Sequence, residues 1–143
     1  MKRPRASRPP SRKHAPFAGG SLILVVEDNR DLRELYAAYL MAHGYRVQVA
    51  SDGHGAFVQA VDARPDLIVT DLSLPHLDGW GTMRLLRTDP RTAHIPIIVC
   101  TGNAFGGVER ALDAGCDAYL VKPCLPEQLL AEARRLLATR RRA

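Results

Sequence analysis

Short apolar runs alternate with stretches of helical periodicity along most of this 143-residue chain. Strands are predicted at residues 22–26, 45–49, 66–71, 95–101 and 117–122. After each of these runs, apolar residues recur at spacings of three and four, which predicts a helix; the last begins at Pro126. Strict alternation of strands and helices favours a parallel sheet with right-handed crossovers. The chain is therefore expected to be an α/β protein, with a doubly wound, five-stranded parallel sheet and helices on both faces.

The second predicted strand has a different pattern from the others. Tyr45, Val47 and Val49 alternate with Arg46 and Gln48, which is typical of a strand with one face in water. The first, third and fourth strands are continuous apolar runs, as expected where helices cover both faces of a sheet. We therefore place the second strand at an edge and predict the flavodoxin-like order 2-1-3-4-5.

The net charge of +5 combines three segments of different sign. Residues 1–20 contain six Lys or Arg and residues 134–143 contain five Arg, with no acid in either segment. Residues 21–133 contain nine bases and fifteen acids, so the part of the chain with the strand and helix pattern is acidic. A domain that binds nucleic acid is normally basic, which argues against that function for the core of this protein.

Composition divides the chain into one domain and two ends. Residues 1–20 are rich in Pro and Arg and contain too few apolar residues to offset their conformational entropy, so we expect a disordered basic tail. Residues 21–138 are the expected domain, and residues 139–143 are a basic C-terminal end. No apolar run approaches the roughly 18 residues of a membrane-spanning helix, and the N-terminus lacks the apolar stretch of a signal peptide.

The three cysteines are Cys100, Cys116 and Cys124, and they form neither a CxxC motif nor a pattern with metal-ligand spacing. Disulfides are rare in reducing compartments, and the chain has no secretion signal. We therefore expect reduced, structural thiols in a cytoplasmic protein, with redox sensing as the alternative.

Polar residues follow four of the five predicted strands: Glu27 and Asp28, then Asp71, Thr101 and Lys122. Ligands of doubly wound sheets bind beyond the carboxyl ends of the strands, so these side chains are expected to converge there. Three neighbouring carboxylates repel one another unless a cation lies among them. Oxygen ligands alone favour Mg²⁺, with Mn²⁺ as the alternative, over zinc, which prefers His or Cys.

The segments LILVVEDNRDLREL, VTDLSLPHLDGW, IIVCTGN and AGCDAYLVKP resemble, in order and spacing, the receiver domain of two-component response regulators. The resemblance covers essentially all of residues 21–138, and the chain is similar to the single-domain chemotaxis receivers of this family. It implies a stand-alone response regulator that takes a phosphoryl group from a sensor histidine kinase or a histidine phosphotransfer protein. Such a protein signals to a downstream protein through a phosphorylation-switched face, is a monomer or weak dimer, and is not a turnover enzyme.

The resemblance also implies roles for the metal and acceptor residues. Asp71 resembles the phosphoacceptor, which forms an acyl phosphate. Glu27 and Asp28 resemble the acidic pair that holds Mg²⁺ together with Asp71 and the backbone carbonyl of Ser73. Glu27 stands where this family more often has Asp.

Three further residues match the switch machinery of the family. Lys122 resembles the lysine that neutralises the phosphoryl oxygens, and its bond to Pro123 is cis in this family. Thr101 resembles the hydroxyl that bonds the new phosphoryl group, and Tyr119 matches the aromatic residue that swings inward with it.

Three alternatives remain open. A phosphatase of the haloacid-dehalogenase type also uses Asp, Thr, Lys and Mg²⁺, but it places a second Asp two residues after its nucleophile, where this chain has Ser73. The basic ends are candidates for contact with nucleic acid or an anionic membrane surface, although Phe17 is their only aromatic residue and solvated charge is the simpler interpretation. Alternatively, the N-terminal tail folds back onto the acidic domain and tunes kinase access.

Overall fold

The computed structural model describes residues 20–102 and 107–142. Strands and helices alternate through these residues in the order β1 (Leu22–Val26), α1 (Arg30–Ala42), β2 (Arg46–Ala50), α2 (Gly53–Ala63), β3 (Leu67–Thr70), α3 (Gly79–Thr88), β4 (Ile97–Thr101), α4 (Gly107–Asp113), β5 (Ala118–Val121) and α5 (Pro126–Arg142). The predicted fold class is confirmed. The last helix continues through residues 139–142, and the tail predicted at residues 1–20 lies, apart from its last residue, outside the described residues.

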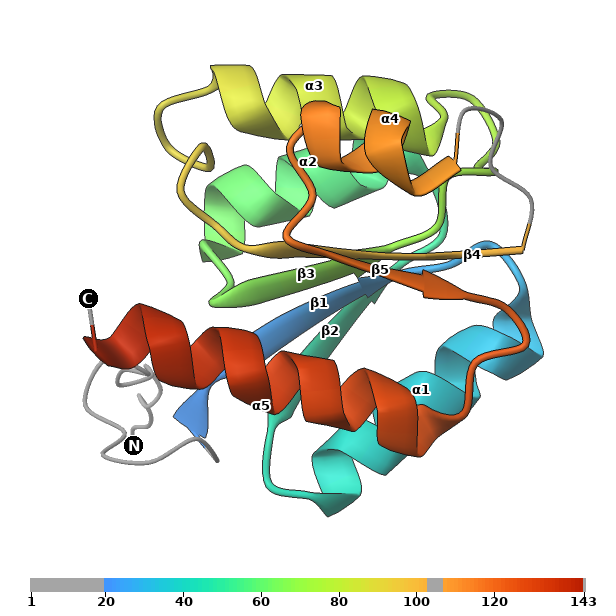
Figure 1. Ribbon diagram of the computed structural model, residues 1–143, viewed down its shortest axis with the longest axis vertical. Coiled ribbons are helices and arrows are strands. Elements are labelled where there is room, and N and C mark those ends of the chain that lie inside the picture. The colour runs from blue at the N-terminus through green and yellow to red at the C-terminus, as the bar shows by residue number, and fades with distance from the viewer. Residues whose placement is uncertain (1–19, 103–106, 143) are drawn as a thin grey trace, which may run out of the picture.

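The strands of the described residues form one parallel sheet in the order β2-β1-β3-β4-β5, as the strand patterns predict. Figure 1 shows α1 and α5 on one face of this sheet and α2, α3 and α4 on the other. Because side chains alternate along a strand, β1 contributes to both core layers. Ile23 and Val25 pack in the layer beneath α1 and α5, and Leu24 and Val26 pack in the opposite layer.

Helix α5 buries its predicted apolar stripe along its length. The stripe consists of Leu129, Leu130, Ala133, Leu136 and Leu137, all buried. The burial of this stripe fixes α5 against the sheet, and its charged residues Glu127, Arg134 and Arg135 are exposed. Within the described residues, no helix combines the length and the apolar character that a bilayer-spanning segment needs.

Helix α1 differs from its predicted pattern at one position. The spacing predicts Leu35 in the buried stripe, but this side chain is 49% exposed. The residues of α1 that are buried are Tyr36, Ala37 and Leu40. The centre of the buried stripe therefore lies between Tyr36 and Ala37, which places Leu35 on the outer side of the helix. Gly44 adopts a φ of 95° directly after the helix, as predicted for its C-terminal stop.

Candidate functional site

The carboxyl ends of four strands carry the polar residues singled out in the sequence. Glu27 and Asp28 follow β1, Asp71 follows β3, Thr101 ends β4 and Lys122 follows β5. The strands are parallel, so all four ends lie at the same edge of the sheet. The structure brings Glu27, Asp71 and Lys122 into direct contact, although Lys122 lies 95 positions from Glu27 and 51 from Asp71.

Asp71 is a buried carboxylate whose two oxygens are both engaged. Its Oδ1 accepts hydrogen bonds from the backbone N–H groups of Leu72, at 2.6 Å, and Ser73, at 3.1 Å. Its Oδ2 accepts a hydrogen bond from Lys122 Nζ at 2.7 Å. Charge-assisted bonds of this kind fix the orientation of the carboxylate. Helix α3 begins close to the backbone of this residue, because a Cβ on its first residue, Gly79, would collide with the Asp71 carbonyl oxygen.

Lys122 lies between two carboxylates. Its Nζ is 2.6 Å from Glu27 Oε1 and 2.7 Å from Asp71 Oδ2. Burial acts to lower the pKa of this ammonium group, but the hydrogen bonds to Asp71 and Glu27 outweigh burial, so the pKa of Lys122 is raised. The site therefore keeps a fixed positive charge at neutral pH. The Lys122–Pro123 peptide bond is cis, as the resemblance implies.

Glu27 and Asp28 differ in their surroundings, although they are adjacent in sequence. Glu27 is buried, and its Oε2 accepts a hydrogen bond from the backbone N–H of Asn29 at 3.1 Å. Burial raises the pKa of the Glu27 carboxyl, and the hydrogen bond from Lys122 partly opposes this effect. Asp28 is exposed at the rim of the site. Arg33 of α1, to which the sequence analysis assigned no role, donates to the Glu27 backbone carbonyl at 2.9 Å.

The acidic residues form a set of donors suited to a divalent cation. Glu27, Asp28 and Asp71 each offer a carboxylate oxygen, and these oxygens lie within 4.8 Å of one another. An all-oxygen set with one solvent-exposed member fits Mg²⁺, which retains several water ligands. Ser73 adjoins this set, and its N–H donates to Asp71.

Thr101 is fully buried, and its Oγ1 has no hydrogen-bond partner among the described residues. A buried hydroxyl without a partner costs about 1–3 kcal/mol. Tyr119 of β5 is half-buried and packs against the core layer beneath α2, α3 and α4.

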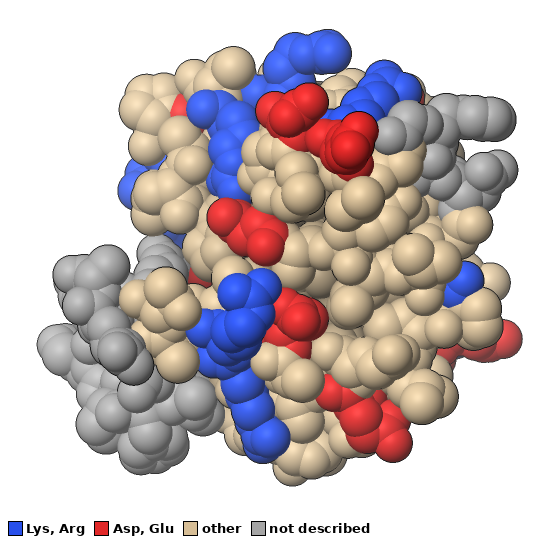
Figure 2. Space-filling view, in the orientation of Figure 1, with Lys and Arg blue, Asp and Glu red and all other residues tan. Residues whose placement is uncertain are grey.

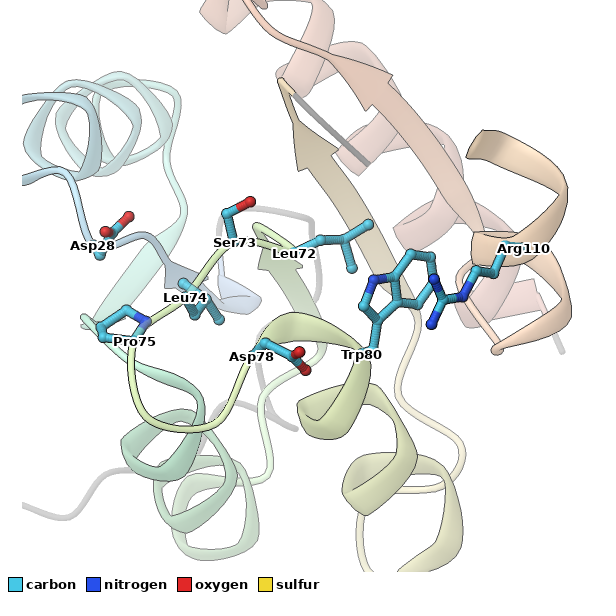
Figure 3. Close-up of a pocket in the computed structure, with 8 residues that line it drawn as sticks. All are labelled: Asp28, Leu72, Ser73, Leu74, Pro75, Asp78, Trp80 and Arg110. Atoms are coloured by element: carbon cyan, nitrogen blue, oxygen red, sulfur yellow. The ribbon is translucent and has the colours of Figure 1, made fainter. Parts of the chain in front are cut away.

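A cavity of about 670 Å³ opens beside these residues (Figure 3). Its lining comprises Asp28, Leu72, Ser73, Leu74, Pro75, Asp78, Trp80 and Arg110. The far wall is formed by Trp80 of α3 and Arg110 of α4, whose guanidinium carbon lies 4.1 Å from the centre of the indole ring. The sequence did not predict this pair, because 30 residues separate its members and neither belongs to a strand end.

Comparison with known proteins places the chain in a family. The family model of the response regulator receiver domain matches residues 23–134. The chain is 41% identical over 118 residues to the DNA-binding dual master transcriptional regulator RpaA of Synechocystis, covering 80% of this chain and 48% of the relative. It is 41% identical over 116 residues to response regulator MprA of Mycolicibacterium vanbaalenii, covering 80% of this chain and 49% of that protein. The chain thus spans about half the length of these relatives.

Solved structures agree with this assignment. The receiver domain of the sensor histidine kinase PA1611 from Pseudomonas aeruginosa, described with a magnesium ion coordinated in its active-site cleft, is 36% identical, with a TM-score of 0.76, and the match covers 82% of this chain and 98% of that one. The chemotaxis response regulator CheY4 of Vibrio cholerae is 29% identical with a TM-score of 0.76, and the match covers 81% of this chain and 98% of that one. The sheet order, the acidic cluster and these matches lead to one conclusion: the chain belongs to the response regulator receiver domains, the phosphoacceptor domains of two-component signalling.

Proposed function

We propose that Asp71 is the phosphoacceptor of this receiver domain, and that it takes its phosphoryl group from a phosphohistidine of a sensor histidine kinase or a histidine phosphotransfer protein. The observation that carries the proposal is the position of Asp71: a buried carboxylate at the carboxyl edge of the sheet, 2.7 Å from the Lys122 ammonium and within the acidic cluster. In the transfer, an Asp71 oxygen forms a bond to phosphorus while the bond from phosphorus to the histidine nitrogen breaks. The products are an acyl phosphate and a free imidazole.

Charge neutralisation is what the site supplies to this reaction. Phosphoryl transfer needs positioning and electrostatic stabilisation more than covalent chemistry. The backbone N–H groups of Leu72 and Ser73 hold one oxygen of Asp71, and Lys122 supplies a positive charge beside the other. Glu27, Asp28, Asp71 and the Ser73 carbonyl would hold Mg²⁺, or Mn²⁺ in its place, which adds further positive charge when bound.

The proposed switch uses the unpartnered hydroxyl of Thr101. A phosphoryl group on Asp71 offers acceptor oxygens, and a hydrogen bond from Thr101 would satisfy its buried hydroxyl. In this proposal the ring of Tyr119 moves inward together with Thr101. Their movement shifts the surface made by α4, β5 and α5 from one conformation toward another. That surface presents exposed apolar side chains at Val108, Leu112, Val121 and Leu125, which suits a protein partner.

The test is phosphorylation by acetyl phosphate in the presence of Mg²⁺, with intact-protein mass spectrometry as the readout. The wild-type chain should gain one phosphoryl group, Asp71→Asn should gain none, and EDTA should abolish the gain. Asp31→Asn is the matched control, because Asp31 is an exposed carboxylate of α1 outside the site. Labelling of Asp71→Asn at the wild-type level would show that another residue is the acceptor.

The remaining features of the proposal follow from this chemistry. A domain that is itself phosphorylated acts stoichiometrically with its donor, so we assign no turnover reaction to it. We place the protein in the cytoplasm as a monomer or weak dimer. Stand-alone action stays a prediction, since the relatives are about twice as long as the matched segment.

A further inference from the structure

A second cavity shares the stacked pair of Trp80 and Arg110 with the cavity beside the acidic cluster. Its volume is about 330 Å³, and its lining comprises Trp80, Arg84, Arg87, Thr88, Arg110 and Ala114. Arginines make up half of this lining, and none of the described residues that line the cavity is acidic. We call it the arginine cavity, and its charge is opposite to that of the cluster formed by Glu27, Asp28 and Asp71.

The arginine cavity lies between α3 and α4. Four of its residues recur at spacings of four, three and one along α3, which places them on one face of that helix: Trp80, Arg84, Arg87 and Thr88. The second wall comes from Arg110 of α4 and from Ala114, which follows four positions later. Figure 2 shows basic side chains along the top of the molecule, over α3 and α4, with acidic side chains in front of them.

Arg87 is a fixed part of the cavity wall. Its Nε and Nη2 donate to the Gly115 carbonyl at 3.0 and 2.7 Å. Its Nη1 donates to the carbonyls of Ala93, at 3.1 Å, and Ile95, at 2.6 Å, and its Nη2 also donates to Asp117 Oδ2 at 2.9 Å. All the N–H groups of this guanidinium are therefore used within the fold. Arg87 gives the cavity a rigid, positively charged wall and leaves ligand contacts to the other two arginines.

Arg84 and Arg110 supply the donors for a ligand. Arg84 is exposed, and its guanidinium has no ion-pair partner in the part of the chain that the structure describes. Arg110 is held at the wall by its contact with Trp80, at 4.1 Å from the guanidinium carbon to the ring centre. The nearest acids along α4 are Glu109 and Asp113, and neither lines the cavity. An anion in the cavity therefore meets guanidinium groups and no lining carboxylate.

We propose that the arginine cavity binds a small molecule through a phosphate group. The planar guanidinium group donates paired N–H bonds that match the oxygens of a phosphate. A concave surface lined by charges of one sign also concentrates the field and raises the local concentration of the counter-ion. Small-molecule sites have volumes of about 300–1,000 Å³, so a cavity of about 330 Å³ suits a compact ligand.

The proposed site is distinct from the one around Asp71. Asp28 and Ser73 line the other cavity and do not line this one. In the absence of Mg²⁺ the three carboxylates of the acidic cluster repel an anion, so a titration in EDTA reports on the arginine cavity. The inference goes beyond the proposed phosphoacceptor function and does not depend on it.

The experiment is isothermal titration calorimetry of the full chain in EDTA at low salt, with inorganic pyrophosphate and ADP as the probes. We expect one pyrophosphate per chain with a dissociation constant of about 0.1–1 mM, and weaker binding as salt is added. Tighter binding of ADP than of pyrophosphate would identify a nucleotide-like ligand, and equal binding would identify recognition of the phosphates alone; both results support the proposal. Adenosine and malonate, which carry no phosphate, should bind at least about tenfold more weakly than pyrophosphate.

Single substitutions test the two donors. Arg84→Gln and Arg110→Gln should each weaken pyrophosphate binding by about tenfold or more, the value of a hydrogen bond to a charged group. Arg134→Gln is the matched control: it removes the same charge from an exposed position of α5, which Figure 1 shows on the other face of the sheet. This control should bind pyrophosphate with the wild-type affinity. Circular dichroism melting curves establish that each variant is folded.

The emission of Trp80 gives an independent readout of where the ligand binds. Trp80 is the only tryptophan of the chain and lines the cavity, so its emission should change with the midpoint that calorimetry gives. Four results would overturn the proposal: no binding of either probe, equal loss of affinity in Arg84→Gln and Arg134→Gln, binding of adenosine or malonate as tight as that of pyrophosphate, and binding of pyrophosphate without a change in the emission of Trp80.

Discussion

The hydroxyl of Thr101 is a polar group that the unphosphorylated fold leaves unsatisfied. It is buried at the end of β4 without a partner among the described residues, at the same edge of the sheet as the carboxylate that we propose to be phosphorylated. A valine has nearly the same shape and removes the unpaired oxygen. The proposed phosphorylated state would explain the identity of this residue, whereas the stability of the unphosphorylated state would not.

This explanation predicts that Thr101→Val stabilises the unphosphorylated protein. We expect a gain of about 1 kcal/mol, because the desolvation cost of an unpaired hydroxyl disappears. In a chain of this size that gain raises the melting temperature by about 3 °C. Thr92→Val is the matched control: Thr92 is equally buried but donates from its Oγ1 to the Leu86 carbonyl at 2.7 Å, so its replacement should lower the melting temperature. A fall of similar size in both variants would contradict the prediction.

Lys122 supports a second prediction, concerning stability and metal. In Lys122→Gln, Glu27 and Asp71 lose their shared cation, which should lower the free energy of unfolding by about 3 kcal/mol in EDTA. Mg²⁺ should restore part of this loss by binding to the folded state only. Because the pKa of Lys122 is raised above 10.5, its contribution is complete at neutral pH and is lost as the pH rises through the folded-state pKa.

Urea unfolding of wild type and variant, with and without Mg²⁺, measures the effect of this substitution. Arg30→Gln is the control, because the exposed Arg30–Glu34 pair contributes at most about 1 kcal/mol and has no link to Mg²⁺. Equal stability of Lys122→Gln and wild type in EDTA would argue against the structural role given to Lys122.

Sequence alone was sufficient to find most of the candidate site residues, because the carboxyl ends of parallel strands must meet at one edge. It did not reveal which atoms touch. The Glu27–Lys122 contact depends on the rotamers of two side chains that are 95 positions apart. Asp71 Oδ1 is held by backbone N–H groups of a loop whose path no periodicity determines. Such contacts follow from packing, which a pattern of residue types does not encode.

At the scale of elements, α3 and α4 are joined by the stacking of Arg110 on Trp80. Trp80 is the only tryptophan of the chain, so its emission reports on this contact. Helix α4 has seven residues, which makes it the shortest helix of the described part, and one buried residue, Ala111. A side-chain contact from α4 to a neighbouring helix therefore matters more to α4 than it would to a longer helix.

Arg110→Gln should change the fluorescence of Trp80 and lower the free energy of unfolding by about 0.5–1 kcal/mol, the value of an exposed cation–π contact. Emission spectra and urea unfolding measure both effects. Arg84→Gln is the control, because Arg84 lies on the same helix as Trp80 and lines the adjoining cavity without stacking on the ring. Unchanged emission in Arg110→Gln would show that the stacked geometry is not populated in solution.

The strand order was predictable from pattern, because an edge strand and a doubly covered strand differ in how apolar residues alternate. The rotation of α1 about its own axis, which decides the side that faces the sheet, was harder to predict from the sequence. Leu32, Leu35, Tyr36, Tyr39 and Leu40 fit a helical stripe, yet the sheet contacts the side of the helix centred between Tyr36 and Ala37. The apolar stripe of α1 is wider than the side of the helix that contacts the sheet, so the residues at one margin of the stripe stay exposed. The sequence does not show which margin this is.

At the scale of the whole molecule, one sheet carries two core layers that share no side chains but share every strand. Cys100 belongs to the layer beneath α1 and α5, and Cys116 belongs to the layer beneath α2, α3 and α4. The cysteines are free and buried, in accord with the reduced, structural thiols that we predicted. Burial, above all, raises the pKa of Cys100 to about 12 and also raises the pKa of Cys116. At pH 8 both thiols are protonated and inaccessible in the folded state, so alkylation reports unfolding.

The shared strands predict that the two layers unfold together. Loss of one layer exposes a face of every strand, and a sheet covered on one face only leaves apolar strands such as β1 and β4 in water. Iodoacetamide labelling of Cys100 and Cys116 along a urea series, quantified by peptide mass spectrometry, should therefore give one common midpoint that matches circular dichroism. Labelling in 8 M urea (roughly the fully unfolded reference) corrects for intrinsic reactivity. If Cys116 became reactive at a lower urea concentration than Cys100, the layer beneath α2, α3 and α4 would open first, and its stability would have to be treated separately from that of the α1–α5 layer.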